Sequence, residues 1–311
     1  MTAGGALNWA TDGRVWPNRE ASSFVRAAGL TWHVQQMGAG PSILLIHGTG
    51  ASTHSWRHLM PLLARDHHCV AIDLPGHGFT SAPPSWQLSL PGMAQGIAAL
   101  LDELKVVPEV VVGHSAGAAI AAQMCLRDGT YRPSVISING AFMPFDGLSG
   151  LLFPSMAKFM AATTLCSKLF AWRAADRRTV EQLISNTGSS LDAQGIDLYA
   201  MLVRNPVHVQ SALGMMADWN LAHLSRQLPR ASVALHLIAG ANDRTVRPDH
   251  SRQLQARVPG ATFTLMRGVG HLAHEERAGD VARLIQELIQ QPVEECIGEP
   301  MQHRTSPSEL A

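Results

Sequence analysis

The sequence predicts an α/β fold in which a mostly parallel sheet carries helices on both faces. Short apolar runs recur along the chain, and each is bounded by glycine, proline or aspartate and followed by a longer segment that suits a helix. Strands that are apolar on both faces are typical of a parallel sheet covered by two helical layers. The runs are Ser42–Ile46, Cys69–Ile72, Val110–Val112, Val135–Ile138 and Val233–Ile238.

The composition indicates a large globular protein. Its 311 residues are 46% hydrophobic and 15% charged, which supplies a sizeable core and excludes a disordered chain. The 24 lysines and arginines balance the 24 aspartates and glutamates, so the basic excess of a nucleic-acid-binding protein is absent. We find no signal peptide, no transmembrane run and no paired cysteine motif. We therefore expect a cytoplasmic protein that binds no nucleic acid.

One stretch, residues 142–225, interrupts the alternation of strands and helices. Its apolar residues recur at helical spacing, so we predict a helical cap inserted into a core made of residues 1–141 and 226–291. The alternative is that this apolar face only packs against the core. We predict that the polar segment 292–311 is a flexible tail. Aromatic and methionine side chains would suit an adaptable pocket wall, and the candidate substrate contacts are Phe142, Met156, Phe159, Met160 and Trp219.

The most specific chemical motif is Gly113-His-Ser115-Ala-Gly117, which lies between an apolar strand and an alanine-rich helical segment. In that context a G-x-S-x-G motif places the serine on a strained turn that exposes its hydroxyl. Glycines flank the serine because bulkier neighbours would clash there. We predict that Ser115 is a nucleophile and that the backbone N–H of Ala116 faces a developing oxyanion. The alternative is a chance match to the pattern.

A second turn, His47-Gly48-Thr49-Gly50, follows the first apolar run. Acyl transfer needs a second N–H donor to the oxyanion, and we predict that the backbone of Thr49 supplies it. A plain tight turn is the alternative. We expect His47 to brace this loop through hydrogen bonds. Asp73-Leu-Pro-Gly-His-Gly78 is interpreted as a turn without chemistry.

The remaining catalytic groups follow the last two strands. Asp243 comes after the run that ends at Ile238, and His271 follows Gly268-Val-Gly. A serine hydroxyl is a weak nucleophile, so His271 would accept its proton while Asp243 orients the imidazole. The order serine, aspartate, histidine predicts the α/β-hydrolase fold with an eight-stranded sheet. We expect residues 274–276 to begin the final helix in a structural role, and no metal or cofactor is predicted.

Three longer stretches carry a more specific resemblance. Trp16-Pro-Asn-Arg-Glu-Ala-Ser, Trp32-His-Val-Gln and His47-Gly-Thr-Gly-Ala-Ser-Thr-His-Ser-Trp56 resemble the magnesium-chelatase accessory family of bacteriochlorophyll biosynthesis. The similarity runs from about Trp16 to about Leu288. It implies a cytoplasmic protein of photosynthetic bacteria that acts near magnesium insertion into protoporphyrin.

The residues and the resemblance leave three functions open. The first is a serine hydrolase acting on a small apolar ester or a tetrapyrrole intermediate. The second is a non-catalytic accessory or porphyrin-handling protein for magnesium chelatase subunits, and the third is a general carboxylesterase. Epoxide hydrolases and haloalkane dehalogenases place aspartate at the nucleophile position, so Ser115 argues against both.

Overall fold

A single eight-stranded sheet forms the centre of the molecule. The computed structural model describes residues 7–127, 131–144, 176–231 and 233–290. The strand order is β1-β2-β4-β3-β5-β6-β7-β8. The strands are β1 (Ser22–Ala27), β2 (Leu30–Met37), β3 (Ser42–Ile46), β4 (His68–Ile72), β5 (Val110–His114), β6 (Ser134–Ile138), β7 (Leu235–Gly240) and β8 (Thr262–Met266).

The sheet is parallel from β4 to β8 and antiparallel only where β1 and β2 join it. All five predicted apolar runs fall on β3 to β7, so the prediction of a mostly parallel eight-stranded sheet is confirmed. The hairpin of β1 and β2 is not among those runs, because β1 is an edge strand of only partly buried and exposed residues.

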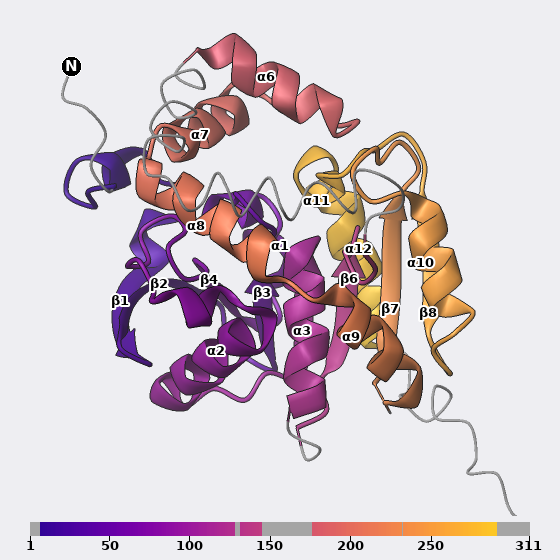
Figure 1. Cartoon of the computed structure of the whole chain (residues 1–311). Helices are drawn as coiled ribbons and strands as arrows, with labels where there is room; N and C mark the ends of the chain where they lie inside the picture. Colours follow the sequence, from indigo (N-terminus) through magenta and orange to yellow (C-terminus); the bar gives the residue numbers. More distant parts are fainter. Residues whose placement is uncertain (1–6, 128–130, 145–175, 232, 291–311) are drawn as a thin grey trace, which may run out of the picture.

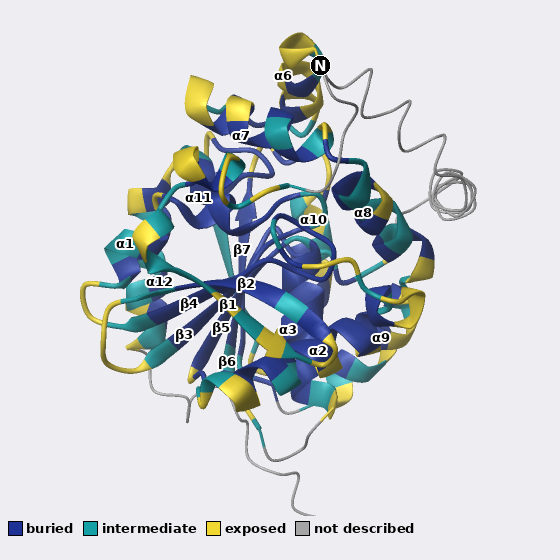
Figure 2. Cartoon of the chain, turned by 90° about the vertical axis from the view of Figure 1, so that its left-hand side faces the viewer, coloured by how far each residue is buried: buried dark blue, intermediate teal, exposed yellow. Residues whose placement is uncertain are grey.

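Helices cover both faces of the sheet, as Figures 1 and 2 show. One face carries α2 (Leu90–Leu104), α3 (Ala116–Arg127) and α10 (Pro248–Gln255), and the other carries α1 (Met60–Leu63) and α12 (Ala278–Ile289). Alternate residues of β3 serve the two layers: Leu44 and Ile46 pack on the α2–α3 side, and Ile43 and Leu45 on the α12 side. This double burial explains why the strands read as uninterrupted apolar runs. No helix in the described ranges is long and apolar enough to cross a bilayer.

Four helices occupy the described part of the insertion between β6 and β7. They are α6 (Arg177–Asn186), α7 (Ala193–Val203), α8 (Pro206–Asp218) and α9 (Leu221–Gln227). Each begins after an aspartate or asparagine whose side chain accepts a hydrogen bond from a first-turn N–H, which fixes the helix start. Figure 1 shows α6 and α7 above the sheet, and α9 packs against α3 on one face. Met156, Phe159, Met160 and the predicted tail lie outside the described residues.

Short 3₁₀ helices line the connections. They are η1 (Asp12–Val15), η2 (Arg19–Ala21), η3 (Thr53–Trp56), η4 (Ser85–Leu88) and η5 (Leu228–Arg230). Near the C-terminus, residues 274–276 belong to a separate short helix, α11 (Ala273–Glu276). The expectation that they begin the final helix is therefore wrong. Arg277, at φ −139° and ψ 57°, leaves the helical conformation and separates α11 from α12.

Candidate active site

Ser115 occupies a strained elbow between β5 and α3. Its φ is +50°, a left-handed conformation that non-glycine residues adopt rarely. Backbone hydrogen bonds hold it there: the Ser115 N–H donates to Ile138 O at 3.0 Å, and Ser115 O accepts from Ala141 N at 3.0 Å. Ser115 is partly exposed while His114 and Ala116 are buried. The turn therefore presents the serine at the carboxyl edge of the sheet.

The two glycines of the motif are required by packing. A Cβ at Gly113 would lie 2.4 Å from the Ala118 nitrogen. A Cβ at Gly117 would lie 2.1 Å from the Ile46 carbonyl oxygen. Both contacts are with backbone atoms, so neither glycine has room for a side chain.

The predicted oxyanion loop lies directly beside the nucleophile. Ala51 N donates to Gly48 O at 3.1 Å and closes a four-residue turn, in which Gly50 has a φ of +76°. A Cβ at Gly48 would lie 3.0 Å from the Ser115 Cβ. On the other side of Ser115, Ala116 is the first residue of α3, where a backbone N–H has no acceptor within the helix. Ala116 thus directly follows the serine, and the loop of the other predicted donor, Thr49, approaches Ser115 at Gly48.

Asp243 and His271 are brought together from the ends of β7 and β8. The Asp243 Oδ2 and His271 Nδ1 atoms are 2.8 Å apart, and the two side chains are 0% and 8% exposed. The Asp243 Oδ1 atom accepts hydrogen bonds from Thr245 N at 2.7 Å and Val246 N at 2.9 Å. With Nδ1 directed at the carboxylate, the Nε2 atom of His271 remains to act as a base.

Two side chains that flank the elbow hold the backbone of His271. Asn139 Nδ2 donates to His271 O at 2.7 Å and to Gly270 O at 3.1 Å, while its Oδ1 accepts from Gly240 N at 2.7 Å. His114 lies within 2.9 Å of the same His271 oxygen through Nε2. Asn139 itself has a φ of +50°, which asparagine tolerates better than most residues. This role of Asn139 was not predicted from the sequence.

The turn between α6 and α7 contacts the loops of both Asp243 and His271. Thr187 O accepts from Arg244 N at 3.1 Å, and Ser189 Oγ accepts from Leu272 N at 2.8 Å. A Cβ at Gly270 would lie 2.3 Å from backbone atoms of Gly188, so the two chains touch. The insertion therefore reaches the loops that carry Asp243 and His271.

His47 braces the oxyanion loop as expected. Its Nδ1 donates to Gly48 O at 2.7 Å, and its Nε2 accepts from Leu74 N at 2.9 Å. Complete burial lowers the pKa of His47, and the two hydrogen bonds match its neutral form. The neighbouring His208, on α8, lies 3.1 Å from Gly50 O through Nε2 and accepts from Gly78 N at 3.2 Å through Nδ1. Burial lowers the pKa of His208 to about 4.

A buried cluster of charged and polar side chains surrounds Glu275. Glu275 pairs with Arg57 and accepts hydrogen bonds from Ser55 Oγ at 2.7 Å and from Tyr199 OH, on α7, at 2.8 Å. Burial raises the pKa of Glu275, although Arg57 and these donors oppose that shift. His274 lies 2.7 Å from Ser55 Oγ, so both α11 residues make structural contacts.

The turn that begins at Asp73 also has a structural role. The Asp73 carboxylate contacts His33 Nδ1 at 2.7 Å and accepts from Thr53 N at 2.7 Å and Phe79 N at 2.9 Å. Trp16 Nε1 donates to Thr53 Oγ1 at 3.1 Å. The stretches that carry the family resemblance therefore meet in space around one buried carboxylate.

The described candidate substrate contacts lie on the α2–α3 side of the sheet. Phe142 is 3% exposed and belongs to that core cluster. Trp219 is partly buried against the same cluster, and its Nε1 donates to Leu88 O at 3.2 Å. Their role in substrate binding remains a prediction. In the described ranges, no group of three or more His, Cys, Asp or Glu side chains is placed to hold a metal ion.

Comparison with known proteins gives the family. The alpha/beta hydrolase fold family matches residues 41–278, and the chain belongs to this family. It is also 39% identical over 272 residues to the magnesium-chelatase 30 kDa subunit of Rhodobacter capsulatus, covering 87% of this chain and 95% of that protein. Both findings confirm the resemblance noted in the sequence.

More distant relatives share the fold. A pyrrolizixenacetamide deacetylase of Xenorhabdus hominickii is 28% identical and matches 81% of this chain and 92% of its own. A solved meta-cleavage product hydrolase of Pseudomonas fluorescens is 20% identical with a TM-score of 0.71, covering 88% of this chain and 98% of that one. The epoxide hydrolase CorEH is 17% identical with a TM-score of 0.74, covering 86% and 98%. These structures support the α/β-hydrolase fold alone.

Proposed function

We propose that the protein is a serine hydrolase that cleaves an ester or a related acyl bond. The observation that carries the proposal is the 2.8 Å contact between His271 Nδ1 and Asp243 Oδ2, at the same sheet edge as the strained Ser115 elbow. A buried carboxylate that fixes the tautomer of an imidazole, at the sheet edge that carries a partly exposed serine, is an arrangement that can activate a hydroxyl. The hydrolase family and its deacetylase member are in keeping with this chemistry.

The proposed reaction proceeds in two halves. Ser115 Oγ attacks the substrate carbonyl carbon as its proton passes to His271 Nε2, and the N–H groups of Thr49 and Ala116 stabilise the oxyanion. The imidazolium, stabilised by Asp243, then protonates the leaving group, and an acyl-enzyme forms. Water repeats the sequence with His271 as base, which releases the acid and restores Ser115. Loss of one oxyanion donor would cost about 3–4 kcal/mol of transition-state stabilisation.

We place this activity in bacteriochlorophyll biosynthesis, near magnesium chelation, on the strength of the relative named as a magnesium-chelatase subunit. The substrate is then a tetrapyrrole intermediate or another small apolar ester, and magnesium chelatase subunits are the proposed partners. Phe142, Trp219 and the cap residues Met156, Phe159 and Met160 remain the candidate substrate contacts.

The second candidate is an accessory protein that handles porphyrin without catalysis. The relative's name as a subunit favours it, because that name describes an assembly component. A general carboxylesterase would also use the triad, but it gives no reason for the contact between Trp16 and Thr53.

The test is pigment synthesis in a photosynthetic strain that lacks this gene. Ser115→Ala should fold with a stability within about 1 kcal/mol of the original, because one partly exposed hydroxyl is removed, yet fail to restore pigment. Ser190→Ala, an exposed serine on the α6–α7 turn, is the matched control and should restore it. A fluorophosphonate probe should label Ser115, and His271→Ala should nearly abolish labelling. Full pigment recovery by Ser115→Ala would overturn the catalytic proposal and favour the accessory one.

A further inference from the structure

A concave site lies at the edge of the sheet opposite Ser115. It is a pocket of about 600 Å³ lined by His223, Arg226, Gln227, Pro229, Arg230 and Arg257. The segment from α9 to η5 leads into the amino end of β7. Arg257 belongs to the segment that joins α10 to β8. Because β5, β7 and β8 are parallel, these segments and the Ser115 elbow are at opposite ends of the strands.

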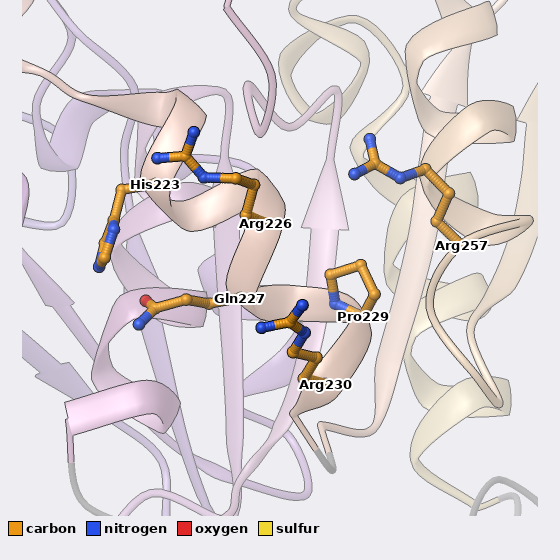
Figure 3. A pocket seen from close by; sticks show the side chains of 6 residues that line it. All are labelled: His223, Arg226, Gln227, Pro229, Arg230 and Arg257. Atoms are coloured by element: carbon orange, nitrogen blue, oxygen red, sulfur yellow. The ribbon is translucent and has the colours of Figure 1, made fainter.

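The described lining of this pocket is cationic without a matching carboxylate. Of the six lining residues in the described ranges, three are arginines, a fourth is a histidine, and none is acidic. Figure 3 shows Arg226 and Arg257 on its two sides, with Pro229 and Arg230 between them. The guanidinium groups of Arg226 and Arg230 make no hydrogen bond or ion pair with any described residue.

In a second pocket, by contrast, arginines and carboxylates occur together. It has a volume of about 350 Å³, and its lining includes Arg65 and Arg283 together with Asp66 and Asp280. Arg283 and Asp280 form an ion pair there. The net charge of the chain is zero, so the unbalanced charge of the first pocket is a local feature.

Arg257 is held in place by neutral acceptors. Its Nη2 donates to Ser225 O at 3.2 Å, and its Nη1 lies 3.4 Å from Ser225 Oγ. Within the described part of the chain these bonds orient the guanidinium without pairing it with a carboxylate, and donors remain for a ligand. An oriented guanidinium loses less conformational freedom on binding than a free one.

We propose that this pocket binds a small molecule that carries two or more carboxylate or phosphate groups. Guanidinium groups form paired, charge-assisted hydrogen bonds with both kinds of anion, and three of them around one space match a multiply charged ligand. The volume is in the range of small-molecule sites, about 300–1,000 Å³. The site is separate from the hydrolase machinery, so it does not depend on the proposed reaction.

The test is calorimetric titration of the full chain at low ionic strength with pyrophosphate and, separately, with citrate. If only pyrophosphate binds, the ligand carries phosphate groups. If only citrate binds, it carries carboxylate groups, and if both bind, the pocket is a general site for small polyanions. The double variant Arg226→Gln/Arg230→Gln should weaken binding by about a hundredfold, since each lost charge-assisted bond costs about tenfold in affinity. Added salt should also weaken binding.

The matched control is Arg65→Gln/Arg283→Gln, which removes the same charge from the second pocket and should leave binding unchanged. Ser115→Ala should also bind normally, so failure of the hydrolase proposal would not affect this one. Two results would overturn the proposal: no binding of either anion, or unchanged binding by the Arg226→Gln/Arg230→Gln variant. If neither anion bound but an oligoglutamate peptide did, the surface would be assigned to an acidic protein.

Discussion

Replacing Asn139 by aspartate tests whether this residue positions His271, the proposed catalytic base. Aspartate has nearly the same shape, tolerates the φ of +50°, and can still accept the hydrogen bond from Gly240 N. It cannot donate to Gly270 O or His271 O, which the amide of Asn139 contacts at 3.1 and 2.7 Å. The change therefore removes two donors from a buried site with little change in volume.

The expected loss of stability depends on which hydrogen bonds the carbonyl oxygens of His271 and Gly270 retain in the variant. His271 O retains the contact with His114 Nε2, so its loss is that of one ordinary hydrogen bond, about 1 kcal/mol. Gly270 O has no other donor among the described residues, and a buried group left unpaired costs about 1–3 kcal/mol. We expect Asn139→Asp to lower the free energy of unfolding by about 2–4 kcal/mol. A displaced imidazole should slow labelling of Ser115 by about tenfold to a hundredfold.

Urea unfolding and the rate of fluorophosphonate labelling, measured on the same preparations, are the assays. The control is Asn205→Asp, at a buried asparagine whose Oδ1 caps α8 by accepting from Val207 N at 3.0 Å. Aspartate caps a helix as well as asparagine does, so stability should change by no more than about 0.5 kcal/mol. If the Asn139→Asp protein matched this control in both assays, the positioning role would be refuted.

Three further predictions concern the surroundings of the site. Because the pKa of His208 is about 4 in the folded state and about 6.5 when unfolded, its contribution to stability is complete above pH 6.5 and lost as the pH falls to 4. Between pH 7 and pH 4, the free energy of unfolding measured with urea should therefore fall by about 3 kcal/mol less in the His208→Gln variant than in the unmodified protein. An equal fall in the two proteins would contradict this. Glu275→Gln should lower the free energy of unfolding by about 3 kcal/mol, since it leaves the buried Arg57 charge without its main partner; a change below about 1 kcal/mol would show that Asp192 suffices. Gly270→Ala should lower the melting temperature, because its Cβ would meet Gly188, whereas Gly279→Ala, with open space in α12, should not; similar effects of the two changes would refute the steric argument.

The strands that position the site could be predicted because burial on both faces makes them uninterrupted apolar runs. Val110–His114 and Ser42–Ile46 are of this kind, and each leads into a glycine-bracketed turn that the sequence displays. Strand β1, Ser-Ser-Phe-Val-Arg-Ala, lies at the sheet edge and has too little apolar character to be recognised. Ser115 and Asp243 were predicted because they follow such strands, and His271 because it follows a Gly-Val-Gly turn and completes a known order, although β8 before it is only partly buried.

The residues that hold the site together could not be predicted in the same way. Asn139 contacts backbone groups that lie 101, 131 and 132 positions away, and only the order of β6, β7 and β8 brings those groups to it. Asp73 looked like part of a turn, because a turn sequence carries no mark of the His33 side chain that meets it. The arginine pocket likewise combines α9 with the segment after α10, which no local pattern connects.

The contact between Gly188 and Gly270 restricts how the insertion can be exchanged between relatives. A Cβ at Gly270 would meet the Gly188 backbone and one at Gly188 would meet Asn242 O, so either side chain would force the facing backbone to move. The residues on either side of Gly188 also hold the two loops, because Thr187 O accepts from Arg244 N and Ser189 Oγ accepts from Leu272 N. An α6–α7 unit grafted from another α/β hydrolase would fit only if it brought a glycine and the same turn to this point. In evolution, the two positions are thus expected to change together, and the insertion and the catalytic loops would be inherited as one unit.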